Sequence, residues 1–203
     1  MNPRVLRRFI MLMGGLIVVA MIATLFADVT TSREPGDLAT ELGAQRLEDG
    51  RYEEALTYFS EALRESPDHR GAIMGRAHVF MKQEKYPDAV AELNYLIEYL
   101  TRTLEPNDTT GRGALAVAYH NRAIIRDRLG KYEQALADYI SAIKTDEDTV
   151  DEPGVIHNIL YGNANPSSAR KRAVYLYEQL KLPPGKRLMR VPEIDAQQRM
   201  RKP

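Results

Sequence analysis

The most informative stretch of this sequence is DGRYEEALTYFSEAL at residues 49–63, because related stretches return twice. They are EKYPDAVAELNYLI at residues 84–97 and LGKYEQALADYISAI at residues 129–143. Equivalent positions of the first two copies lie 34 residues apart, whereas the third copy is displaced by 46 residues. A repeat of this period is typical of arrays in which each copy is one supersecondary unit, here with a twelve-residue insertion before the last.

Each copy predicts two antiparallel helices. In the first copy, residues 39–49 form one helix that Gly50 ends, and residues 52–65 form the next, which stops before Pro67. No β-strand pattern competes with these helices, so the sequence predicts an all-α fold.

An apolar stripe on the second helix of the hairpin explains why the copies should stack. Tyr52, Phe59 and Leu63 recur at helical spacing, and the small Ala55 allows the paired helices to approach closely. One hairpin cannot bury this stripe alone. Neighbouring hairpins are therefore expected to stack into a short solenoid.

These residues resemble the tetratricopeptide repeat (TPR) family. The positions that match its pattern in the first copy are Leu42, Gly43, Tyr52, Ala55, Phe59, Ala62 and Pro67. The resemblance covers residues 36–148 and implies three TPR repeats at residues 36–69, 70–103 and 116–149, with the insertion near residues 104–115. It implies an α-solenoid fold.

The insertion and the C-terminal region depart from the regular repeat. Apolar residues continue beyond the expected end of the second copy, which predicts a lengthened helix followed by a loop at residues 105–112, EPNDTTGR. After Val150 the pattern decays. Residues 150–182 predict a divergent fourth hairpin that caps the stack, and residues 183–203 predict a basic tail.

The second helix of this fourth hairpin is expected to begin after Ser168, with Ala173, Tyr177 and Leu180 on its buried side. Residues 154–162 are expected to form the first helix.

An uncharged run of nineteen residues, 9–27, precedes the repeats. As a helix it would be roughly 28 Å long, close to the hydrocarbon thickness of a bilayer. We interpret it as a transmembrane signal anchor. A removed signal peptide and a buried helix are the alternatives.

Basic residues at positions 4, 7 and 8 place residues 1–8 in the cytoplasm by the positive-inside rule. Residues 28–35 then form a linker, and residues 28–203 lie across the membrane. The expected location is a bacterial inner membrane with a periplasmic domain. A lumenal domain or one on the mitochondrial outer membrane is the alternative in a eukaryote.

The sequence carries little catalytic chemistry. It has no cysteine, four histidines and no nucleophile or phosphate-loop motif, so we expect no enzyme activity, no cofactor and no metal. His78 and His120, with Asp127 nearby, form the one conceivable metal site. Packing histidines are the simpler interpretation.

The family resemblance implies a concave groove, lined by the first helices of the copies, for an extended peptide or an amphipathic helix. The groove positions it implies are Thr40, Ala44, Leu47, Met74, His78, Met81, His120, Ile124 and Asp127. Relatives that clamp a terminal carboxylate have Lys and Asn where this chain has Thr40 and Ala44, and Asn121 alone keeps their pattern. A mixed apolar groove favours an apolar or amphipathic partner.

Charge is segregated along the chain although the 28 basic and 28 acidic residues cancel. Residues 28–164 carry a net charge of −10 and residues 165–203 a net charge of +7. The basic tail surface is predicted to comprise Arg170, Lys171, Arg172, Lys186, Arg187 and Arg190. These residues either meet an anionic partner or fold back on the acidic repeats; nucleic acid is not an expected partner.

Together these features predict a membrane-tethered TPR scaffold that binds protein partners and supports the assembly or stability of a membrane or envelope complex. The alternative is a constitutive accessory subunit of a larger membrane complex, held through its C-terminal tail.

Overall fold

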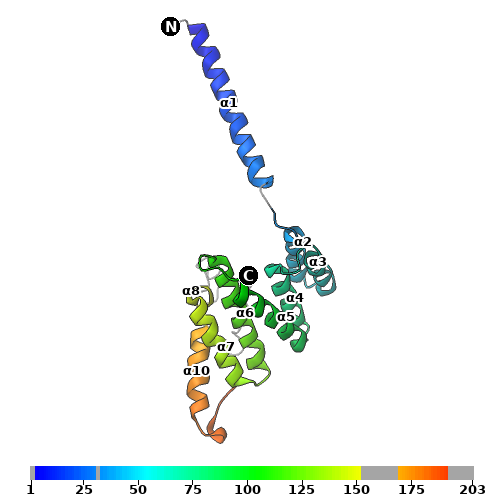
Figure 1. The fold of residues 1–203 in the computed structure, drawn as a ribbon, viewed down its shortest axis with the longest axis vertical. Coiled ribbons are helices and arrows are strands. Elements are labelled where there is room, and N and C mark those ends of the chain that lie inside the picture. Colours follow the sequence, from blue (N-terminus) through cyan, green and yellow to red (C-terminus); the bar gives the residue numbers. More distant parts are fainter. Residues whose placement is uncertain (1–2, 31–32, 152–168, 192–203) are drawn as a thin grey trace. The chain divides into compact units, whose positions relative to one another are not determined.

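The computed structural model describes residues 3–30, 33–151 and 169–191, and every regular element in these ranges is a helix (Figure 1). The chain divides into two compact units, Met1–Pro35 and Gly36–Pro203.

The first unit consists of helix α1, Pro3–Thr30, which includes the apolar run. Large apolar side chains described along it are exposed, among them Phe9, Leu12, Leu16 and Val19. None of the helices in the described ranges combines the length and the apolar character needed to cross a membrane. The transmembrane anchor predicted at residues 9–27 is therefore not supported. That prediction depended on the absence of charge over nineteen residues and on the length of the helix that they would form.

The second unit is a stack of helical hairpins. Its helices are α2 (Asp37–Glu48), α3 (Tyr52–Glu65), α4 (Arg70–Lys82), α5 (Tyr86–Thr103), α6 (Thr109–Arg128), α7 (Tyr132–Thr145), α8 (Glu147–Asp151) and α10 (Ala169–Lys181), followed by the 3₁₀ turn η1 (Pro184–Lys186). From α2 to α7 each helix packs against the next one, and α2 also contacts α4, which contacts α6. The first helices of the hairpins thus form one row, as the repeat pattern predicts.

Left-handed residues end the first helix of each hairpin. Gly50 and Gly130 follow α2 and α6, each with a φ of 74°, a conformation in which glycine has no steric cost. Glu84 takes the equivalent place after α4 with a φ of 59°. The three turns have the same geometry although only two carry glycine.

The ring of Phe59 joins the first two hairpins. A Cβ atom added at Gly43 of α2 would lie 2.7 Å from Phe59 Cε1, and one added at Gly75 of α4 would lie closer still to the ring. Phe59 itself is 1% exposed. An aromatic side chain of α3 thus lies between two positions at which a Cβ atom would overlap its ring.

The insertion lengthens α5, as predicted, and also α6, and the loop between them is shorter than predicted. Helix α5 has 18 residues and α6 has 20, and they are joined by residues 104–108. Asp108 caps α6 by accepting a hydrogen bond from the Gly111 N–H at 2.6 Å, and it pairs with Arg70 at 2.8 Å. Both interactions lower the pKa of the Asp108 carboxyl. Residues 109–112 therefore belong to α6, and the predicted loop at 105–112 is too long.

In the C-terminal cap, the buried side of α10 is not the side that the sequence predicts. Tyr177 is 52% exposed and Leu180 is half-buried, whereas Ala173 and Leu176 are buried. The remaining buried positions are Ala169 and Arg172. The predicted first helix at residues 154–162 lies outside the described residues.

Arg172 determines this orientation of α10. Its guanidinium donates two hydrogen bonds to the Asp127 carboxylate of α6, at 2.6 and 2.8 Å, and a third to the Met189 carbonyl at 3.0 Å. The two charged side chains are 1% and 2% exposed. Burying either charge alone is costly. Helix α10 is therefore rotated so that its Arg172 side chain points toward Asp127 of α6. Arg172 is thus a buried residue, not part of a basic surface.

We expect Gly75→Ala to destabilise the repeats although alanine favours helix by about 1 kcal/mol. The new methyl would overlap Phe59, and overpacking a core costs about 1–3 kcal/mol. Urea unfolding followed by circular dichroism measures the change.

Gly113→Ala in α6 is the matched control, because its Cβ would meet no atom closer than 3.5 Å. That variant should gain stability. The double variant Phe59→Leu/Gly75→Ala should lose less free energy of unfolding than the sum of the losses in the two single variants. Equal effects of Gly75→Ala and Gly113→Ala would contradict the packing described for Phe59.

Asp127→Ala should lower the free energy of unfolding by about 3–5 kcal/mol, because it leaves the Arg172 charge buried without its carboxylate. The double variant Asp127→Leu/Arg172→Met removes both charges and should recover most of that loss. Denaturant titration of the three proteins provides the measurement.

The exposed pair Lys181–Glu178, 3.0 Å apart on the same helix, is the control. Glu178→Ala should leave the unfolding midpoint nearly unchanged. A loss in Asp127→Ala no greater than in Glu178→Ala would show that the buried pair does not hold α10 in place.

Candidate functional site

The nine predicted groove residues all lie on the row of first helices. Helix α2 carries Thr40, Ala44 and Leu47, α4 carries Met74, His78 and Met81, and α6 carries His120, Ile124 and Asp127. Because α2 contacts α4 and α4 contacts α6, these positions follow one another across the repeats. The structure thus brings the helices of the predicted groove together.

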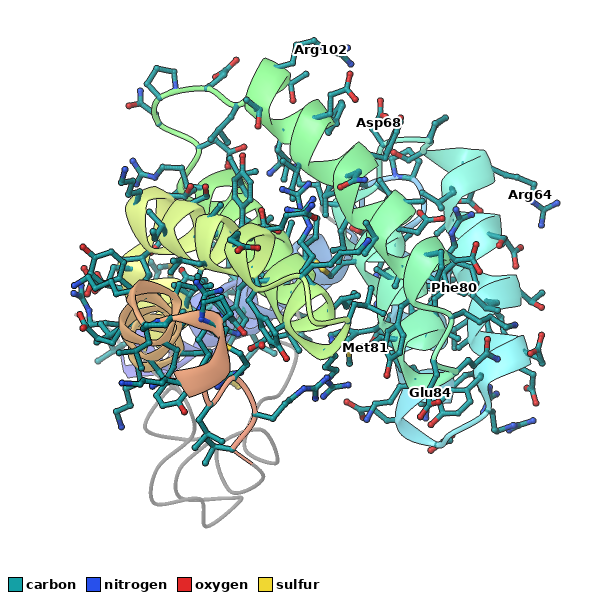
Figure 2. The ribbon with its side chains drawn as sticks, turned by 90° about the horizontal axis from the view of Figure 1, so that it is seen from below. Arg64, Asp68, Phe80, Met81, Glu84 and Arg102 are labelled. Atoms are coloured by element: carbon teal, nitrogen blue, oxygen red, sulfur yellow. The ribbon has the colours of Figure 1, made fainter. Side chains whose placement is uncertain are left out.

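Burial separates the nine residues into two groups. The six on α4 and α6 are at most 7% exposed. Met81 lies among the helices, whereas Arg64 and Arg102 point outward (Figure 2). On α2, by contrast, Ala44 is exposed and Thr40 and Leu47 are half-buried. The accessible part of the predicted groove is therefore its α2 part, and the positions on α4 and α6 are packing residues.

Asn121, the residue that keeps the carboxylate-clamp pattern, lies where α4 packs directly on α6. The Asn121 side-chain amide donates to the Met74 sulfur at 3.3 Å, and both side chains are fully buried. A buried amide contacting a neighbouring helix is not presented to a ligand. The structure therefore offers no clamp at Asn121.

A polar cluster that the sequence analysis missed lies at the start of α2 and α4. His69 caps α4, because its Nδ1 atom accepts from the Ala72 N–H at 3.2 Å. The proton consequently resides on Nε2, which donates to the Asp37 carboxylate at 3.0 Å. The Thr40 hydroxyl lies 3.3 Å from Nδ1. Thr40 is thus oriented by His69, and the sequence signal was a histidine directly before a helix.

A second missed cluster involves arginines on α6. Arg122 donates two hydrogen bonds to the Asp138 carboxylate of α7, at 2.7 and 2.9 Å, and Arg126 donates a third at 2.7 Å. Arg122 also reaches the Asn94 side chain of α5. Burial lowers the pKa of the Arg126 guanidinium, which still carries its charge. These contacts hold α6 against its neighbours and have no evident catalytic role.

The predicted basic tail surface is partly directed inward. Besides the buried Arg172, Arg170 pairs with Glu147, and Arg190 donates to the Arg128 carbonyl. Arg187 donates to two backbone carbonyls at the end of α10. Lys171 and Lys186 are exposed. At least four of the six residues therefore contact the chain itself, and Arg170, Arg172 and Arg190 among them contact residues 127–147.

The conceivable metal site is not assembled. Within the ranges that the structure describes, no group of three or more His, Cys, Asp or Glu side chains could hold a metal ion. His120 packs edge-on against Tyr139 with 5.7 Å between ring centroids, and Asp127 binds Arg172.

Comparison with known proteins supports the repeats. A tetratricopeptide repeat family model matches residues 46–102, and a second one matches residues 116–149. TPR repeat-containing thioredoxin TDX of Arabidopsis thaliana is 27% identical over 60% of this chain and 29% of its own length. Human DnaJ homolog subfamily C member 7 is 30% identical over 47% of this chain and 20% of its own length. The chain thus spans less than a third of these curated relatives.

A solved structure shares the fold. The first TPR domain of Spaghetti (RPAP3), bound to the HSP90 peptide SRMEEVD, superposes with a TM-score of 0.51 at 18% identity, over 73% of this chain and 94% of that one. At this identity the likeness concerns the fold alone. The family models identify the hairpins of residues 46–102 and 116–149 as tetratricopeptide repeats.

Proposed function

We propose that this chain is a protein-interaction scaffold whose row of first helices binds a segment of another protein. The observation that carries the proposal is the set of tetratricopeptide repeats, with an accessible stretch of that row on α2. Stacked repeats of this kind form extended surfaces that suit a chain segment better than a small molecule.

The chemistry of α2 favours an apolar or amphipathic segment. Ala44 is exposed, and Leu47 packs at the edge of the core that contains Phe59. Thr40 and Ala44 supply no positive charge for a terminal carboxylate. We therefore do not propose a peptide like the HSP90 peptide of the solved structure as the ligand of this chain. The proposed partner presents apolar side chains.

A photoreactive amino acid in place of Ala44 should crosslink to the partner in living cells, because Ala44 lies on the proposed binding surface. The same substitution at Glu61, exposed on the second helix of the same hairpin, is the matched control. Adducts at position 44 that are at least several-fold more abundant than at position 61 are expected on immunoblots. Equal labelling at both positions would count against the proposal.

Ala44→Arg should reduce the crosslinking partner's binding while the circular dichroism spectrum stays unchanged. Met74→Glu is unsuitable as a binding test, since Met74 is fully buried and a charge there would unfold the stack.

A partner within a membrane or envelope complex is a further part of the proposal. It rests on the exposed apolar side chains of α1 and on the basic residues that precede the apolar run. The alternative function, a constitutive subunit held through the tail, is less favoured because Arg172, Arg187 and Arg190 contact the chain itself. The absence of enzyme activity stays a prediction from the sequence.

The location of the repeats also stays a prediction, based on the charges that flank residues 9–27. If residues 28–203 lie in the periplasm, protease added to intact spheroplasts should degrade the repeats but spare a cytoplasmic marker protein. Alkaline carbonate extraction should leave an anchored chain in the membrane pellet. Protection of the repeats until the cells are lysed would reject the predicted topology.

A further inference from the structure

The last described helix of the stack exposes an apolar and basic face. On α10, Val174 is 57% and Tyr177 is 52% exposed, and the lysines at positions 171 and 181 are exposed beside them. The Lys181 ammonium lies 3.9 Å from the centre of the Tyr177 ring and pairs with Glu178. This surface, formed by residues 171, 174, 177, 178 and 181, is the α10 face.

Packing within the stack explains why this face is left over. Helix α10 packs against α7, as α4 packs against α3 and α6 against α5 (Figure 1). In each earlier hairpin the helix in this place is covered by the helix that follows it, whereas α10, predicted as the second helix of the fourth hairpin, is followed by the 3₁₀ turn η1. The described residues supply no such helix over Val174 and Tyr177, which stay more than half exposed.

The opposite end of the stack has an exposed face whose charged residues are acidic. Helix α2 exposes Leu38, at 55%, together with Glu41, Gln45 and Glu48. These four residues, the α2 face, have the spacing 0, 3, 7 and 10, which is also the spacing of residues 171, 174, 178 and 181. Both sets therefore lie along one side of a helix.

The α2 face borders the proposed partner-binding surface. Thr40 and Leu47 lie on another side of the helix, whereas Ala44 follows Glu41 by three residues and precedes Glu48 by four, so these side chains are neighbours. Self-association is therefore measured with the purified chain, in which no partner competes at Ala44.

We propose that the α10 face of one copy of this chain docks on the α2 face of a second copy, head to tail. The apolar side chains at positions 174 and 177 meet Leu38, and the two lysines meet Glu41 and Glu48. The contact repeats the helix-on-helix joint that already builds the stack. Because the two faces differ, the interface is heterologous and adds further copies in the same direction.

Cysteine pairs test this geometry directly, because the chain has no cysteine of its own. Full-length Leu38→Cys and Tyr177→Cys proteins, purified in the same detergent and mixed, should form an intermolecular disulfide under mild oxidation. The matched control replaces Leu38→Cys with Glu61→Cys on α3. We expect at least ten-fold more crosslinked dimer from the first mixture, and equal yields would overturn the proposal.

Charge reversal tests the chemistry of the same contact. Two double variants are used, Lys171→Glu/Lys181→Glu and Glu41→Lys/Glu48→Lys. In each of them the α10 face and the α2 face carry charge of the same sign and repel. Each variant alone should therefore sediment as a smaller species than the unmodified chain. Their mixture pairs every acidic face with a basic one and should restore association. Raising the salt from 50 to 500 mM should weaken it in every case.

Association through α1 would behave differently in these experiments. Such association would persist in both charge-reversal variants and would not increase when the two are mixed. Cysteines at positions 38 and 61 would then form the disulfide with Tyr177→Cys in equal yield. Any of these results, with circular dichroism showing that the variants are folded, would refute the head-to-tail contact.

Discussion

The fit of the Phe59 ring between Gly43 and Gly75 is the contact on which the stack most depends. The ring lies so close to α2 and α4 that a Cβ atom at either glycine would overlap it. The contact therefore fixes how closely the first two hairpins approach, and it joins α2 and α4, whose contact begins the row of first helices.

Charged groups hold the later hairpins where apolar packing alone would leave their orientation open. Arg172 and Asp127 are both buried and bond each other at 2.6 Å, so α10 has one favourable rotation about its axis. Arg122 and Arg126 share the Asp138 carboxylate in the same way between α6 and α7. Several charged residues that the sequence suggests are at the surface therefore form ion pairs inside the stack. The zero net charge of the chain gives no sign of these pairs.

Prediction from the sequence succeeded where a feature depends on local periodicity. The hairpins, their order and the lengthened α5 follow from apolar spacing and from glycine, which are properties of neighbouring residues. It failed at residues 109–112, because the Asp108 cap extends α6 into a stretch that looks like a loop. It also failed for Tyr177, because the buried side of α10 depends on Asp127, 45 residues away from Arg172.

The sequence by itself determined that residues 46–102 and 116–149 form tetratricopeptide hairpins, because a repeated pattern encodes the same local contacts each time. Only the tertiary structure decided which predicted groove residues are accessible. Met74 and His120 occupy the helical position that Thr40 has on α2, and Asp127 that of Leu47, yet they are buried by contacts between different helices. Burial depends on what packs against a residue, and that partner lies far away in the chain.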